Sequence, residues 1–268
     1  MVTKVRTFQR RAVARFNNVT LLTFLTLLLC SVPIATSWAA TRELDRSRQC
    51  IVVLTNDWAS TNGVLHAFER AETTASWKKQ IPKFAVVVGK NGLGRGRGLI
   101  HLDFKGAPHK KEGDDRAPAG IFRLSSAFGY ATARSAAWVK LPYLVLSKQT
   151  EGIDDPNSHY YNKLVDRSKI TQIDWRSSEK MRRDDILYKW GVMVDHNPAA
   201  IPGAGSCIFL HIWKNSSAPT AGCTAMPESD LLRLLRWLDP ARHPILVQMP
   251  RAAYQLIQSK YGLPSEDS

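Results

Sequence analysis

The sequence contains few cysteines, and none of its motifs has the residue spacing of a metal or nucleotide site. Only four of the 268 residues are cysteine, and no internal repeat or low-complexity block occurs. His66, His101, His109 and His243 lack the separation that zinc ligands show. The glycine-rich stretch 89–98 (GKNGLGRGRG) lacks the order of a P-loop, so we interpret it as a flexible hairpin connection. We therefore expect no metal and no cofactor.

The longest apolar run, residues 19–34, is shorter than the about 20 residues that a transmembrane helix needs. Five basic residues precede it, and no acidic residue occurs before Glu43. Small residues at Ser37 and Ala39 occupy the two positions that signal peptidase reads. This pattern predicts a signal peptide over residues 1–39 and export to the periplasm or cell envelope. An uncleaved N-terminal anchor is the alternative.

The chain is strongly basic even without its first 39 residues. Removing the five basic residues of that segment lowers the formal net charge from +14 to +9. A cationic exported protein suits an anionic surrounding such as a cell wall, although a solvated basic surface needs no partner at all. The basic residues are scattered among acidic ones, so we expect no nucleic-acid partner. We expect no membrane contact beyond the signal peptide, and the oligomeric state is left open.

An odd number of cysteines remains after export, because Cys30 is removed with the signal peptide. Cys50, Cys207 and Cys223 are left, so at least one thiol is unpaired or joined to another molecule in an oxidising compartment. A disulfide between Cys50 and Cys207 is one of the alternatives. It would leave Cys223 free.

Short apolar segments separated by glycine and proline turns predict one mainly-β domain over residues 50–250, with a few short helices. A polar linker, residues 40–49, precedes the domain, and a C-terminal tail, residues 251–268, follows it. The expected helices cover 175–185 and 227–238, the second because four leucines three and four residues apart share one face. The clearest strands are expected at residues 50–55, 64–70, 84–89, 188–196 and 206–213.

The last of these strands carries a histidine on a regular alternation. Cys207, Phe209, His211 and Trp213 fall on one face, and the apolar residues between them fall on the core face. A rigid strand is a suitable support for a general base, since a small misplacement lowers the reaction rate. His211 is therefore a candidate base. A hydrogen-bonded structural histidine is the alternative.

Cys223 follows this strand after a short loop and precedes the helix that starts near Pro227. A helix N-terminus and a nearby imidazole favour thiolate over thiol, so we expect Cys223 to be an activated nucleophile. Backbone N–H groups at Gly222 and Thr224 are candidate donors to an oxyanion. A buried cysteine that only fills space is the alternative.

His211, the loop after it and the segment Thr220-Ala-Gly-Cys223 resemble the signature of the YkuD-type L,D-transpeptidase catalytic domain. The stretch GDDRAPAGIF, residues 113–122, resembles the Gly/Asp-rich strand entry of the same family, and the resemblance covers about residues 80–248. Two positions depart from the family motif. Ala221 replaces its histidine, and Ala225 lies where the family keeps a polar residue.

The resemblance implies a single β-sandwich or barrel domain that acts on peptidoglycan stem peptides in cell wall biogenesis. Cys223 would be the nucleophile, His211 the general base, and no metal or cofactor would take part. Candidate substrate-binding residues are Thr220, Trp213, His196 and Tyr161. Of these, His196 and Tyr161 are more readily explained as structural or solvated, as are Tyr160, Asn197 and Lys111. The alternatives are an L,D-carboxypeptidase that uses the same thioester, and a non-catalytic cell-wall-binding module.

Overall fold

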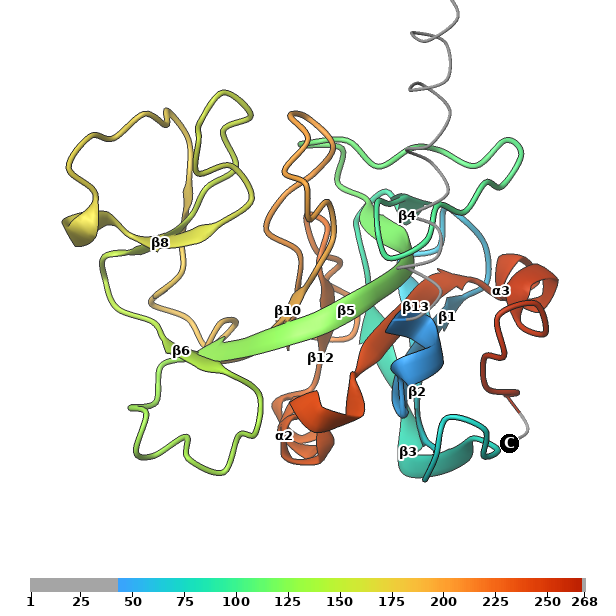
Figure 1. Ribbon diagram of the computed structural model, residues 1–268. Coiled ribbons are helices and arrows are strands. Elements are labelled where there is room, and N and C mark those ends of the chain that lie inside the picture. Colours follow the sequence, from blue (N-terminus) through green and yellow to red (C-terminus); the bar gives the residue numbers. More distant parts are fainter. Residues whose placement is uncertain (1–42, 267–268) are drawn as a thin grey trace, which may run out of the picture. The chain divides into compact units, whose positions relative to one another are not determined.

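β-strands dominate residues 43–266, the part of the chain that the computed structural model describes (Figure 1). The predicted signal peptide lies outside these residues. The mainly-β class expected from the sequence is confirmed. The strands are β1 Gln49–Thr55, β2 Asn62–Glu69, β3 Lys78–Val87, β4 Leu93–Arg95, β5 Ala117–Gly129, β6 Tyr143–Val145, β7 Thr150–Gly152, β8 Leu164–Asp166, β9 Glu179–Lys180, β10 Trp190–Val194, β11 Phe209–Ile212, β12 Thr224–Met226 and β13 Ile245–Pro250.

The large sheet closes on itself. Its strand order is β10-β11-β12-β3-β2-β1-β13-β5, and β10 also pairs with β5, which completes the circuit. β4 and β6 attach to β5 as additional strands. A separate three-stranded sheet has the order β8-β7-β9. Closure satisfies the edge hydrogen bonds of the large sheet and encloses the main apolar core.

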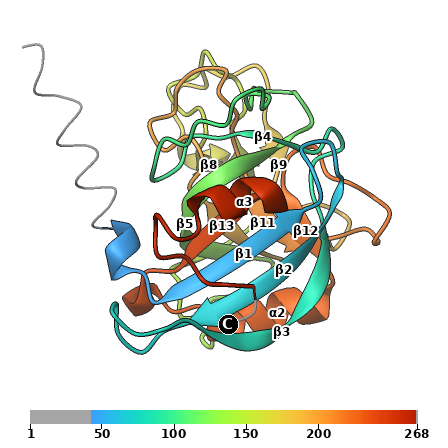
Figure 2. The same cartoon turned by 90° about the vertical axis from the view of Figure 1, so that its right-hand side faces the viewer.

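Two α-helices pack on the large sheet. α2 (Glu228–Trp237) buries Leu231, Leu234 and Leu235, as the leucine spacing predicted. α3 (Arg251–Ile257) lies over β13 and β1 (Figure 2). Single 3-10 turns cover Arg167–Lys169 and Pro240–Arg242. No helix within residues 43–266 has the length and apolar character needed to cross a bilayer.

One sequence prediction about local structure is wrong, and another is right only in part. Residues 175–185 contain no helix, because Glu179 and Lys180 pair with β7 and long-range pairing overrides the local preference. In the stretch 89–98, residues 89–92 form a tight turn with an antiparallel bridge between Gly89 and Gly92, but residues 93–95 form β4 and pair in parallel with β5. Gly89 passes so close to the start of β5 that an added Cβ would lie 2.4 Å from the Asp115 carbonyl oxygen.

Both ends of the described chain pack against the domain. Residues 43–46, assigned to the linker from the sequence, form a helical turn whose Leu44 is buried in the main core. At the C-terminal end, Tyr254, Ile257 and Leu263 are buried in the same core. The packed unit therefore extends beyond residues 50–250 on both sides.

A buried carboxylate organises the small sheet. Glu151 in β7 is fully buried, and it accepts hydrogen bonds from Trp175 Nε1 at 3.0 Å and Ser178 Oγ at 2.7 Å. It also forms ion pairs with Lys180 and Arg167. Burial alone would raise the pKa of this carboxyl, but the hydrogen bonds and the Lys180 ammonium lower it to about 2. The small sheet therefore depends on a charged Glu151.

We expect Glu151→Gln to lower the free energy of unfolding at pH 7 by about 2 kcal/mol, because it removes the charge of a buried carboxylate that accepts two hydrogen bonds and pairs with two partly exposed cations. The free energy of unfolding is measured by urea denaturation. Glu72→Gln, which makes the same change at an exposed position, is the control. The pKa of Glu151 in the folded protein lies below its value in the unfolded chain. Its contribution to the free energy of unfolding is therefore complete above about pH 4.5 and disappears as the pH falls toward 2. A difference of less than about 0.5 kcal/mol at pH 7 would contradict this assignment.

Candidate active site

Parallel pairing of β11 and β12 places the histidine beside the cysteine. Leu210 pairs with Thr224 and His211 pairs with Ala225, so Cys223 lies level with Phe209. Side chains alternate along a strand, and His211 and Cys223 therefore project from the same face, two residues apart on neighbouring strands. The predicted alternation of β11 is confirmed. Ile208, Leu210 and Ile212 join the main core, whereas Cys207 and Phe209 belong to a second apolar cluster.

Five residues predicted for the site line one cleft of about 440 Å³. They are Cys223, His211, Gly222, Thr220 and Trp213. Three other predicted site residues, Thr224, His196 and Tyr161, lie outside its lining.

The orientation of the His211 ring is fixed by the backbone. Nδ1 lies 2.7 Å from the Ile212 carbonyl oxygen, which can only accept, so Nδ1 carries the proton and Nε2 is left as a base. The ring of Tyr188 packs edge-on against the imidazole, with 5.2 Å between centroids. Burial lowers the pKa of His211 to about 4, so the ring is neutral at pH 7.

Cys223 is a buried thiol, contrary to the activated thiolate that the sequence predicted. Strand β12 separates it from α2, so no helix N-terminus lies next to it. Its Sγ accepts a hydrogen bond from Phe209 N–H at 3.3 Å. Burial, followed by the negative charge of Glu179, nevertheless raises its pKa to about 12. The cleft thus holds a neutral thiol beside a neutral imidazole.

Thr220 fixes the turn that carries the cysteine. Its Oγ1 donates to the Cys223 carbonyl oxygen at 2.7 Å and accepts from Gly222 N–H at 3.1 Å. The Gly222 amide, expected to face an oxyanion, is therefore already hydrogen-bonded within the turn. Thr224 is buried in β12, and its Oγ1 donates to Gln248 Oε1 at 2.6 Å. The Cys223 amide lies between these two positions.

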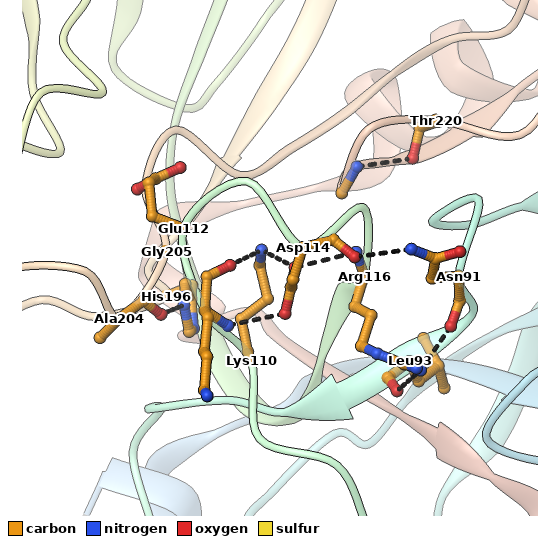
Figure 3. Close-up of polar contacts among 12 residues, drawn as sticks. Asn91, Leu93, Lys110, Glu112, Asp114, Arg116, His196, Ala204, Gly205 and Thr220 are labelled. Atoms are coloured by element: carbon orange, nitrogen blue, oxygen red, sulfur yellow. Dashed lines mark hydrogen bonds and ion pairs between the residues drawn. The ribbon is translucent and has the colours of Figure 1, made fainter.

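The loop before β5 packs against the turn that carries Cys223. Lys110 is buried, and its Nζ donates a hydrogen bond to Asp114 Oδ1 at 2.5 Å (Figure 3). The Asp114 carboxylate also accepts hydrogen bonds from the backbone N–H groups of Lys111 and Arg116. The Arg116 carbonyl oxygen lies 3.1 Å from where a Cβ on Gly222 would be. Glycine at this position thus allows the loop and the cysteine turn to touch. Asp114 and Arg116 lie in the stretch 113–122, whose sequence resembles the strand entry of the family.

The cleft also has a polar wall that the sequence did not predict. Tyr188 Oη donates to Glu179 Oε1 at 2.7 Å, and Arg183 pairs with the same carboxylate at 3.4 Å. Asp154 and Glu112 also line the cleft. Glu112 comes from the loop before β5, and the others come from the small sheet, its β7–β8 loop and the segment between it and β10. No motif or spacing in the sequence relates them to Cys223.

Two candidate substrate-binding residues, Tyr161 and His196, have the structural role that the sequence favoured for them. Tyr161 is buried, donates to Glu112 Oε2 at 2.5 Å and accepts from the Gly205 amide at 3.1 Å. His196 is also buried, and its Nε2 lies 2.9 Å from the Ala204 carbonyl oxygen.

All three cysteines of the described chain are free thiols. Cys50 lies in the main core, whereas Cys207 lies with Cys223 in the second apolar cluster, so the structure contains no Cys50–Cys207 disulfide. Within residues 43–266, no three His, Cys, Asp or Glu side chains converge as they would around a metal ion.

We expect the alkylation rate of Cys223 by iodoacetamide to rise about tenfold per pH unit between pH 7 and 10, because only the thiolate reacts and its fraction is small throughout. The rate is measured by mass spectrometry of the peptide that carries Cys223. Cys223→Ala provides the blank. A rate that is already constant above about pH 6 would indicate a thiolate–imidazolium pair and contradict the neutral pair.

Comparison with known proteins agrees with this geometry. A family model described as the L,D-transpeptidase catalytic domain (YkuD) matches residues 58–247, which is most of the chain and includes every residue of the cleft named above. No curated protein and no solved structure gives a significant match.

Proposed function

Because the chain belongs to the L,D-transpeptidase catalytic domain (YkuD) family, we propose that it is an exported, cysteine-dependent L,D-transpeptidase of peptidoglycan stem peptides. The observation that carries this proposal is that His211 in β11 and Cys223, directly before the adjacent parallel strand β12, line one cleft. The Ile212 carbonyl holds the imidazole in the tautomer that a base requires. Nucleophile, base and orienting group are thus all present.

The first half-reaction forms a thioester. Cys223 Sγ attacks the carbonyl that joins meso-diaminopimelate to D-Ala, and His211 Nε2 accepts the thiol proton as the C–S bond forms. The backbone amide of Cys223 supports the negative oxygen of the tetrahedral intermediate. His211 then gives the proton to the nitrogen of the leaving D-Ala, and the C–N bond breaks.

The second half-reaction transfers the acyl group. His211 Nε2 removes a proton from the amine of a second stem peptide as that amine attacks the thioester, and the thiol of Cys223 leaves with the proton. Attack by water instead would make the protein an L,D-carboxypeptidase. Cys223 and His211 are both neutral before substrate binds, so no thiolate–imidazolium pair loses its solvation when a substrate enters the buried site. This holds for an amine acceptor and for water alike.

The N-terminal segment supports a location in the cell envelope. Residues 1–39 have the basic, apolar and small-residue regions of a signal peptide, and the chain after them keeps a net charge of +9. That charge favours contact with an anionic wall. We infer that the protein acts in the periplasm or at the wall, where its substrate lies.

We expect the purified protein to release D-Ala from a disaccharide tetrapeptide and to form a cross-linked dimer, with both products followed by liquid chromatography and mass spectrometry. Cys223→Ala should abolish turnover, and His211→Gln should lower kcat by about 10²- to 10⁴-fold, because the general base is removed. Cys50→Ala, which removes a thiol far from the cleft, should retain activity. A carbapenem should add covalently to the wild type and not to Cys223→Ala.

Each other outcome identifies a different function. D-Ala release without a dimer, unchanged by an added amine acceptor, would indicate a carboxypeptidase. Binding to isolated sacculi that persists in Cys223→Ala, with no turnover by the wild type, would indicate a wall-binding module. Equal carbapenem labelling of Cys223→Ala would remove Cys223 from the mechanism.

A further inference from the structure

A second cavity, here named the basic pocket, adjoins the cleft. It has a volume of about 310 Å³, and Lys110 lines both cavities. All the ionisable side chains that line it are basic or imidazole, and none is Asp or Glu. They are Arg95, Arg97, His101, His109, Lys110 and Lys111. The active cleft differs, since acidic side chains line it alongside basic ones.

Part of this positive charge has no partner within the described chain. Lys110 is paired with Asp114, and Arg95 contacts Asp103 and His109. The side chains of Arg97 and Lys111 make no ion pair or hydrogen bond with any residue in 43–266. The Nε–H of Arg95 is buried without an acceptor. Like charges repel one another and a buried donor without an acceptor is costly, so the arrangement favours an anionic ligand.

The walls of the basic pocket are rigid before any ligand arrives. His196 Nδ1 accepts a hydrogen bond from Arg97 N–H at 3.2 Å, so Nε2 donates to the Ala204 carbonyl oxygen at 2.9 Å and joins the two walls (Figure 3). Burial lowers the pKa of His196 to about 4, which keeps this ring neutral and its hydrogen bonds in place. The backbone N–H of Asn197 donates a second hydrogen bond, to the Arg97 carbonyl oxygen at 2.7 Å. Such preorganisation lowers the cost of binding.

We propose that the basic pocket binds a carboxylate of the substrate while the scissile carbonyl of the same molecule lies at Cys223. Guanidinium groups match the planar, two-oxygen geometry of a carboxylate. Leu102, Ile201 and Pro202 supply an apolar lining that suits the carbon skeleton carrying the anion rather than a free inorganic ion. The identity of that substrate rests on the proposed function, whereas the binding of an organic oxyanion is independent of it.

The first test measures binding alone. The full chain is titrated with tricarballylate, a small tricarboxylate, and with inorganic phosphate, at constant ionic strength by isothermal titration calorimetry. We expect saturable binding of tricarballylate that is weakened at least tenfold in Arg97→Gln/Lys111→Gln. Arg134→Gln/Lys148→Gln removes the same charge from exposed positions outside the pocket and should bind as the wild type does. No saturable binding of tricarballylate, or an equal loss in both double variants, would overturn the proposal.

The second test identifies the source of the anion. With the disaccharide tetrapeptide as substrate, Arg97→Gln/Lys111→Gln should raise KM about tenfold and leave kcat within about twofold, since it removes uniform binding. An unchanged KM together with lost phosphate binding would assign the pocket to a separate phosphate-bearing ligand and overturn the proposal. Cys223→Ala should still bind tricarballylate. If it does so while the wild type turns over no tetrapeptide, the proposed function fails and the anion site stands.

Discussion

The position of the active site depends on the closure of the large sheet by β5. This strand is 13 residues long, and successive stretches of it pair with β4, β13, β10 and β6. Pairing with β13 and β10 joins the two ends of the strand order, which fixes β11 and β12 between neighbours on both sides. The register Leu210–Thr224 then sets the relation of His211 to Cys223. A one-residue slip would turn either side chain away from the cleft.

Burial controls the protonation of Cys223 and His211. The same apolar surroundings raise the pKa of the thiol and lower that of the imidazole, so both groups are neutral before substrate binds. In the proposed mechanism, the negative charge that develops during attack is therefore met by the Cys223 backbone amide and by the His211 cation formed at the same moment. Thr220, which bonds both Gly222 and the Cys223 carbonyl, keeps that turn rigid. Such preorganisation costs no rearrangement in the transition state.

Lys110 lies between the cleft that contains Cys223 and the basic pocket. Its buried ammonium holds the Asp114 loop, lies in the lining of both cavities and lowers the pKa of Cys223 slightly against the effect of burial. A ligand that spans the cleft and the basic pocket passes this residue. The glycine-rich stretch 89–98 gains a role in the same way, because β4 brings Arg95 and Arg97 to the wall of that pocket.

The sequence alone determined the elements whose signal is local. Alternation along 206–213 and the leucine spacing of 227–238 predicted β11 and α2, and the Thr220–Cys223 motif predicted the family. Only the tertiary structure decided the rest. The polar wall of the cleft, the support role of His196 and the state of the Cys223 thiol depend on contacts between distant segments. Burial and long-range strand pairing, which carry no local signature, override what neighbouring residues suggest.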